Sequence, residues 1–124
     1  MAENLKTILI AEDERAISKA LQLKLTKLGY EVTAVFNGKQ ALDMLKGMDY
    51  DLVLLDLMMP EVDGFAVLEA LKKENKKQKV IVSSNLSQES DFAKAKDLGA
   101  TDYYVKSNTS ISEVVEHVQK AIES

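Results

Sequence analysis

Short apolar runs alternate along this chain with longer segments in which apolar residues recur at helical spacing. There are five such runs, and several are apolar at consecutive positions and rich in β-branched residues. They cover residues 5–11, 32–36, 52–55, 80–82 and 103–105. A strand with one solvent face alternates apolar and polar residues, whereas a parallel strand covered on both faces does not. The runs therefore predict parallel strands that are buried on both faces.

The segments between these runs carry apolar stripes of the kind that a helix turns toward a core. The first stripe comprises Ile17, Ala20, Leu21, Leu25 and Leu28. Gly29 follows it as a stop signal. Similar stripes lie within residues 41–48, 67–71, 92–98 and 111–122. The last is the clearest prediction, because Ser110 and Glu113 have the spacing of a capping box at its start.

The order of these elements is a strand followed by a helix, repeated five times. That order predicts an α/β fold of five βα units, a doubly wound parallel sheet with right-handed crossovers. A chain of 124 residues is the size of one ordinary domain, and it contains no linker or low-complexity segment. We therefore expect one domain over residues 1–124, with no output domain after the last helix.

Composition removes several classes of function. The chain has no cysteine, which excludes disulfides, zinc–cysteine sites and thiol catalysis, and one histidine cannot build a multi-histidine metal site. A net charge of −4 argues against direct contact with nucleic acid. No apolar run approaches a membrane span, and residues 1–6 do not resemble a signal peptide. We expect a cytoplasmic protein that does not insert into membranes.

Polar residues follow four of the predicted strands, where the crevice of an open α/β sheet lies. Residues 12–14 are Glu-Asp-Glu, Asp56 ends the third strand, residues 83–85 are Ser-Ser-Asn and Lys106 ends the fifth. Clustered carboxylates repel one another and raise each other's pKa unless they share a cation. Oxygen ligands in this number suit Mg²⁺, which retains waters and accepts phosphate oxygens.

Each of these residues also has a simpler interpretation when it is taken alone. Asp13 or Glu14 could cap the first helix, and a lysine at a strand end is usually solvated. We expect His117, which follows Glu116, to lie inertly on the surface. We likewise interpret residues 72–77 as a solvated helix end. The coincidence of charged groups at several strand ends favours a cation and phosphate site.

Four segments carry a resemblance to a known family. They are Ile-Ala-Glu-Asp-Glu at 10–14, Leu-Leu-Asp-Leu-Met-Met-Pro-Glu-Val-Asp-Gly at 54–64, Val-Ser-Ser at 82–84, and Gly-Ala-Thr-Asp-Tyr-Tyr-Val-Lys at 99–106. In this order and spacing, nearly the whole chain resembles the receiver domain of two-component response regulators, including the chemotaxis regulators. The resemblance implies a flavodoxin-like fold with strand order 2-1-3-4-5.

The resemblance also implies a phosphorylation site. Asp56 matches the aspartate that accepts a phosphoryl group from a histidine kinase or phosphotransfer protein. Glu12 and Asp13 match the acidic pair that holds Mg²⁺ with it, and the backbone carbonyl of Met58 matches a further ligand. Such a protein is a phosphoacceptor with slow self-dephosphorylation rather than a conventional enzyme.

Three further matches concern the response to phosphorylation. Ser84 matches the hydroxyl residue that bonds one phosphoryl oxygen, and Lys106 matches the lysine that pairs with another. Tyr103 matches the aromatic residue whose rotamer reports phosphorylation, which leaves Tyr104 as its core-facing neighbour. The implied output is the face formed by the fourth helix, fifth strand and fifth helix. It would bind a downstream effector protein or domain, and a phosphorylation-dependent homodimer is a further option.

The sequence departs from the family pattern beside the predicted site. Ser107 stands where proline usually follows the lysine, so we predict a trans Lys106–Ser107 bond and a rearranged loop. Asn85 stands where alanine or glycine is usual, at the mouth of the site. Met58 and Leu86 are apolar and would order an attacking water poorly. We expect these residues to tune the rates of phosphorylation and dephosphorylation.

Three other functions are alternatives to a signalling switch. An aspartyl-phosphate phosphatase needs a second aspartate two residues after the nucleophile, where this chain has Met58. A flavodoxin-like nucleotide binder needs a phosphate-cradling loop after the first strand, where the acidic run would repel phosphate. A pseudo-receiver that is not phosphorylated and acts as a binding module is less favoured, because the chemical groups of the site are all present.

Overall fold

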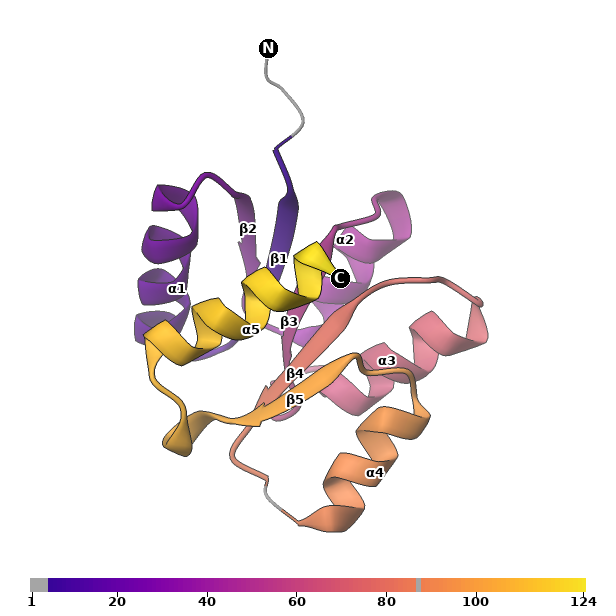
Figure 1. Ribbon diagram of the computed structural model, residues 1–124. Coiled ribbons are helices and arrows are strands. Elements are labelled where there is room, and N and C mark those ends of the chain that lie inside the picture. The colour runs from indigo at the N-terminus through magenta and orange to yellow at the C-terminus, as the bar shows by residue number, and fades with distance from the viewer. Residues whose placement is uncertain (1–4, 87) are drawn as a thin grey trace.

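A computed structural model describes residues 5–86 and 88–124 as alternating strands and helices (Figure 1). The strands are β1 (Thr7–Ala11), β2 (Glu31–Val35), β3 (Leu52–Asp56), β4 (Val80–Ser84) and β5 (Asp102–Val105). The helices are α1 (Arg15–Lys27), α2 (Gly38–Gly47), α3 (Gly64–Lys73), α4 (Glu89–Asp97) and α5 (Ile111–Glu123), and a short 3₁₀ turn, η1, covers Lys106–Asn108. The predicted five βα units are therefore confirmed.

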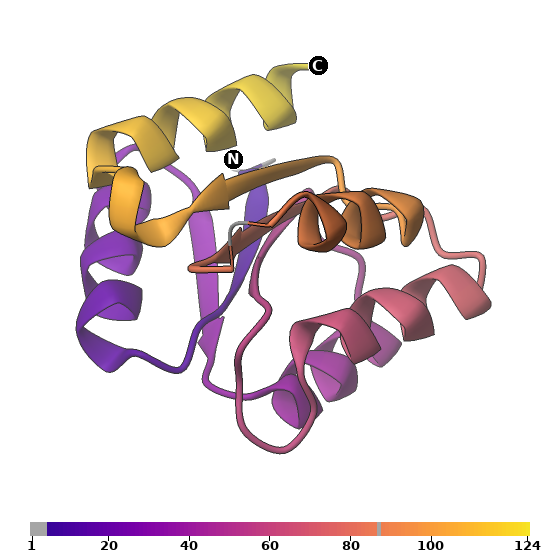
Figure 2. The same cartoon turned by 90° about the horizontal axis from the view of Figure 1, so that it is seen from below.

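The strands form one parallel sheet in the order β2-β1-β3-β4-β5. This confirms the predicted doubly wound α/β fold. Figures 1 and 2 show α1 and α5 on one face and α2, α3 and α4 on the other. Because all strands run in one direction, their carboxyl ends meet at the same edge of the sheet.

Two hydrophobic clusters, one on each face, hold the helices to the sheet. Leu21 and Leu25 of α1 pack with Val118 of α5 on the first face. On the other face, Leu45 of α2 and Val67 of α3 pack with the opposite side chains of the strands. Every residue of β3 and β4 is buried, which explains why those runs are continuously apolar instead of alternating.

Most local signals in the sequence lie where they were expected. The Ser110–Glu113 capping box forms with both of its hydrogen bonds, and Gly29 adopts a φ of 99° after α1. The first strand begins at Thr7, two residues later than predicted, and Leu5 is 57% exposed. The register of β1 with β2 begins with Thr7 opposite Glu31, whose backbone amide donates to the carbonyl of Lys6 at 2.9 Å.

Lys76 corrects our interpretation of residues 72–77 as a solvated helix end, because its side chain is bound to neighbouring groups. Its ammonium group donates to the backbone carbonyls of Leu45 and Met48 and pairs with Asp49 at 3.0 Å. It therefore satisfies carbonyls at the end of α2.

Within the part of the chain that the structure describes, no helix has both the length and the apolar character needed to cross a bilayer.

Candidate functional site

Three carboxylates meet at the carboxyl ends of β1 and β3. Glu12 and Asp13 directly follow β1, and Asp56 is the last residue of β3. One ligand oxygen from each lies within 4.8 Å of the others. Glu12 and Asp56 are buried, whereas Asp13 is half-buried and borders solvent. The neighbouring positions of β1 and β3 in the sheet bring these acids together, as we predicted from the strand ends.

Burial places two of these carboxylates in an unfavourable environment for negative charge. It raises the pKa of Glu12 from 4.5 to about 7, and the charge of Asp56 contributes to this rise. Burial also raises the pKa of Asp56, while hydrogen bonds from the Met58 amide and Lys106 oppose the rise. A pair of buried acids with raised pKa values is a group for which binding a cation would be favourable.

Lys106, which directly follows β5, supplies the positive charge of the site. Its Nζ atom lies 3.0 Å from Oδ2 of Asp56 and 3.1 Å from both carboxylate oxygens of Glu12. It also contacts Oε2 of Glu14 at 2.6 Å. Burial by itself lowers the pKa of Lys106, but the bonds to Glu14 and Asp56 outweigh it and raise that pKa above its usual range.

The contact of Glu14 with Lys106 was not predicted, although Glu14 belongs to the acidic run after the first strand and was one of two candidate caps of the first helix. Glu14 does occupy the N-cap position of α1, but its side chain makes no capping hydrogen bond. Its backbone amide instead donates to Oε2 of Glu12 at 3.0 Å. The one signal in the sequence was a third acid directly after Glu12 and Asp13.

A turn after β3 fixes the orientation of Asp56. The backbone amide of Met58 donates to Oδ1 of Asp56 at 3.1 Å, and the Met58 side chain is 61% exposed. Gly64 packs so closely on this turn that a Cβ atom there would lie 2.5 Å from the carbonyl oxygen of Asp56. Only glycine allows this approach without moving the end of β3.

Ser84 and Tyr103 are linked through the loop that follows β4. Ser84 is fully buried, and its Oγ accepts a hydrogen bond from the backbone amide of Leu86 at 3.1 Å. The Tyr103 hydroxyl donates to the carbonyl of the same Leu86 at 2.8 Å. The Tyr103 ring also packs edge-on against Phe92 of α4, with 4.5 Å between ring centroids. Tyr104 is the buried neighbour, as expected.

The loop after β5 begins with a trans peptide bond and contacts the loop after β4. The Lys106–Ser107 peptide bond is trans, as predicted, and Lys106 begins the η1 turn. The backbone amide of Ser107 donates to Oδ1 of Asn85 at 2.9 Å. Asn85 is exposed, and Leu86 is half-buried against the core beneath α4.

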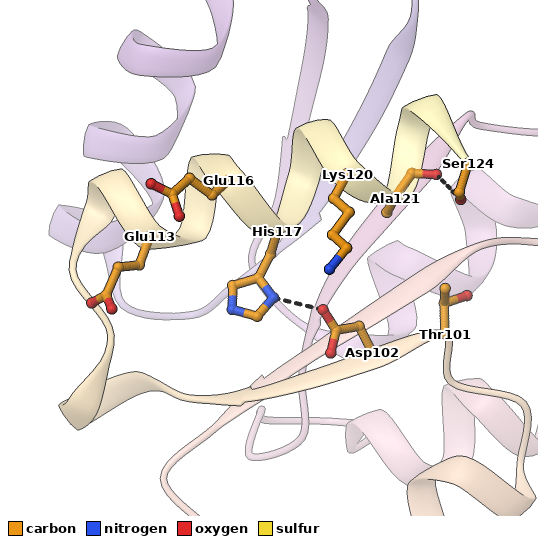
Figure 3. A pocket seen from close by; sticks show the side chains of 8 residues that line it. All are labelled: Thr101, Asp102, Glu113, Glu116, His117, Lys120, Ala121 and Ser124. Atoms are coloured by element: carbon orange, nitrogen blue, oxygen red, sulfur yellow. Dashed lines mark hydrogen bonds and ion pairs between the residues drawn. The ribbon is translucent and has the colours of Figure 1, made fainter.

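His117 lies partly exposed at the surface, as expected, but it makes specific contacts that the sequence did not predict. Its Nδ1 atom lies 2.6 Å from Oδ2 of Asp102, and its ring stacks on Tyr104 with 5.5 Å between centroids. Figure 3 shows His117 turned toward Asp102 beside a surface pocket between β5 and α5. The residues that line this pocket include none from the acidic cluster. It is therefore separate from the site at the strand ends.

Comparisons with known proteins identify the family of this chain. The sequence profile described as "Response regulator receiver domain" matches residues 8–119. The solved receiver domain of the Francisella response regulator 1452 is 30% identical, with a TM-score of 0.89. The match covers 95% of this chain and 97% of that one.

Two curated relatives also match most of the chain. The DltR transcriptional regulatory protein of Streptococcus agalactiae is 37% identical over 99 residues, which is 80% of this chain and 44% of that protein. YkoG of Bacillus subtilis, named an uncharacterized transcriptional regulatory protein, is 41% identical over 80% of this chain and 43% of its own length. This chain thus spans less than half the length of these relatives. Since the family match covers most of its residues, the chain belongs to the response regulator receiver domain family of two-component systems.

Proposed function

We propose that this protein is a phosphorylation-dependent signalling switch that accepts a phosphoryl group on Asp56. The observation that carries the proposal is the setting of that carboxylate at the end of β3. One oxygen accepts from the Met58 amide and the other lies 3.0 Å from the ammonium group of Lys106. An aspartate is a weak nucleophile, but phosphoryl transfer depends mainly on positioning and charge neutralisation, and both are available here.

The donor is a phosphohistidine on a histidine kinase or phosphotransfer protein. A carboxylate oxygen of Asp56 forms a bond to phosphorus while the bond from phosphorus to the histidine nitrogen breaks, and the imidazole leaves with that electron pair. Lys106 remains protonated and moves from the carboxylates toward the incoming phosphoryl oxygens. The product is an acyl phosphate with about two negative charges.

The donor set fits Mg²⁺. Glu12, Asp13 and Asp56 offer oxygen ligands within 4.8 Å of one another, and Asp13 keeps the cluster open to solvent. Together with the backbone carbonyl of Met58, these groups would hold a hard cation that retains several waters. When bound, Mg²⁺ would neutralise charge on the transferring phosphoryl group. The raised pKa of Glu12 agrees with a carboxylate placed to share a cation.

The signal leaves the site through Ser84. Its hydroxyl accepts from the amide of Leu86 and still has its own hydrogen to donate to a phosphoryl oxygen on Asp56. Movement of Ser84 toward that oxygen would strain or break the bond to Leu86 and displace this residue. Displacing Leu86 also displaces the acceptor of the Tyr103 hydroxyl bond. Tyr103 would then repack against Phe92 and shift α4. The altered α4-β5-α5 face would bind a downstream effector protein or domain or a second copy of the chain. A coupling of about 1–3 kcal/mol is sufficient for this switch.

The test is to incubate the protein with Mg²⁺ and acetyl phosphate and to measure its intact mass. We expect the wild type to gain the mass of one phosphoryl group and Asp56→Asn to gain none. Asp51→Asn is a matched control, because Asp51 precedes the same strand at its opposite end and is exposed. It should accept the phosphoryl group normally. A wild type that gains no mass would favour the alternative, a pseudo-receiver that acts only as a binding module.

A further inference from the structure

Two of the positions at which this chain departs from the family pattern, Asn85 and Ser107, are in contact with each other. The backbone amide of Ser107 donates a hydrogen bond of 2.9 Å to Oδ1 of Asn85, across 22 residues of sequence. Asn85 directly follows Ser84, and Ser107 directly follows Lys106. We call this pair the Asn85–Ser107 clasp. It joins the two loops that carry the hydroxyl and the ammonium group of the site.

The clasp lies where the sheet no longer holds these loops together. Ser84 and Val105 are the last paired residues of β4 and β5. Beyond them the ladder between these strands ends, and the chain enters the loop before α4 on one side and the η1 turn on the other. The side chain of Asn85 therefore continues the connection between the strands past the end of their backbone pairing.

This bond requires both departures at once. An acceptor atom is needed on the side chain at position 85, and neither alanine nor glycine has one. A backbone N–H is needed at position 107, and proline has none. A change at either position alone leaves the other group without this partner, so the two residues are expected to act as a unit.

We propose that Asn85 is a positioning residue that acts through the amide of Ser107. The clasp holds the backbone of Lys106 at a set distance from Ser84, so that both side chains meet the same phosphoryl group. This inference rests on the proposed function, because it assigns Ser84 and Lys106 to one phosphoryl group. Asn85 itself need not touch that group. The alternative role of Asn85, as a side chain that narrows the mouth of the site, predicts a different result.

The experiment is a double-mutant cycle on the rate of phosphorylation by acetyl phosphate with Mg²⁺. A single exposed hydrogen bond has a modest net value, so we expect Asn85→Ala to slow the reaction by about 2- to 10-fold. Ser107→Ala keeps the backbone amide and is the matched control, with an unchanged rate. In a protein that already carries Ser107→Pro, adding Asn85→Ala should change nothing, because the donor has gone. If Asn85 only narrows the mouth, Asn85→Ala speeds the reaction equally in both backgrounds, which overturns the proposal.

Hydrogen exchange at the Ser107 amide provides a second readout that does not depend on phosphorylation. Asn85→Ala should speed this exchange by about 2- to 10-fold, whereas Asn85→Asp, which keeps an acceptor oxygen, should leave it slow. Equal exchange in wild type and Asn85→Ala would show that the clasp does not form. If the wild type accepts no phosphoryl group, the proposed function fails together with the positioning role. A phosphorylated wild type with an unchanged rate in Asn85→Ala contradicts the positioning role alone.

Discussion

The phenol hydroxyl of Tyr103 donates a 2.8 Å hydrogen bond to the backbone carbonyl of Leu86. Leu86 also donates its amide to Ser84, so one residue of the loop joins the buried hydroxyl of the site to the aromatic ring beside α4. Burial raises the pKa of Tyr103, which keeps the phenol protonated as a donor. The contact therefore gives the site a physical connection to its proposed output face.

Removing this hydroxyl should weaken the connection without removing the ring. We expect Tyr103→Phe to cost about 0.5–1.5 kcal/mol of stability, the net value of one hydrogen bond. Phosphorylation should then cause smaller amide shifts in α4 than it does in the wild type, measured by two-dimensional NMR. Tyr30→Phe, just before edge strand β2, is the control and should leave the α4 response intact. Undiminished shifts in Tyr103→Phe would contradict the role of this bond.

The acidic cluster predicts an unusual dependence of stability on pH. Burial raises the pKa of Glu12 from 4.5 to about 7, so the folded state holds this proton more tightly than the unfolded state. The resulting stabilisation is complete below pH 4.5 and is lost as the pH rises through about 7. Without Mg²⁺, the free energy of unfolding should fall by about 1–3 kcal/mol from about pH 5 to about pH 8.

Two comparisons of the free energy of unfolding in urea test whether this pH dependence comes from the acidic cluster. Glu12→Gln removes the titrating group and should flatten the pH dependence over the same range. Adding Mg²⁺ at about pH 8 should restore stability to the wild type and much less to Glu12→Gln, because binding to the folded state stabilises it. A stability that increases with pH in the Mg²⁺-free wild type would contradict the raised pKa.

Met58 should slow the loss of the phosphoryl group. Its side chain is 61% exposed directly beside Asp56, and a thioether offers an attacking water almost no hydrogen bond. We expect Met58→Asn to accelerate dephosphorylation by about 2- to 10-fold, since an amide can orient that water. Met48→Asn is the control, because Met48 is 42% exposed and follows α2, whereas Met58 contacts Asp56. Decay of the phosphoprotein mass with time measures both rates.

Gly64 should be required for the position of Asp56. A Cβ atom at Gly64 would lie 2.5 Å from the carbonyl oxygen of Asp56 and 2.7 Å from the Cα of Leu57, both backbone atoms. We expect Gly64→Ala to cost about 1–3 kcal/mol and to slow phosphorylation. Gly47→Ala is the matched control, since a Cβ there meets nothing within 4 Å. It should be neutral or stabilise α2 by up to about 1 kcal/mol, measured by thermal unfolding.

The features that the sequence determined by itself are those encoded within a few residues. The capping box of Ser110 and Glu113 needs only a spacing of three residues, and it forms as predicted. The burial of β3 and β4 agrees with the prediction from their runs. The same prediction is wrong for β2 and β5, which are only partly buried because they lie at the edges of the sheet. The meeting of Asp56 with Glu12 could also be predicted, because parallel strands present their carboxyl ends at one edge.

Tertiary structure decided the contacts that join distant segments. His117 looked like a surface residue beside Glu116, but the packing of α5 on β5 brings it against Asp102 and Tyr104. No pattern within α5 encodes that neighbourhood. The start of β1 was likewise set by where β2 begins to pair with it and not by the extent of the apolar run.

Within the site, too, the sequence shows which residues are neighbours along the chain, and only the tertiary structure decides which distant groups they contact. The sequence places Glu14 next to Glu12 and Asn85 next to Ser84, but it does not say where their side chains turn. Glu14 reaches Lys106 across 92 residues, and Asn85 reaches Ser107 across 22. These bonds depend on how far each loop extends past its strand and on the register of β4 with β5. A hydrogen bond requires its two atoms to lie within about 3 Å of each other. The loop extension and the strand register that bring these atoms so close are set only when the sheet assembles.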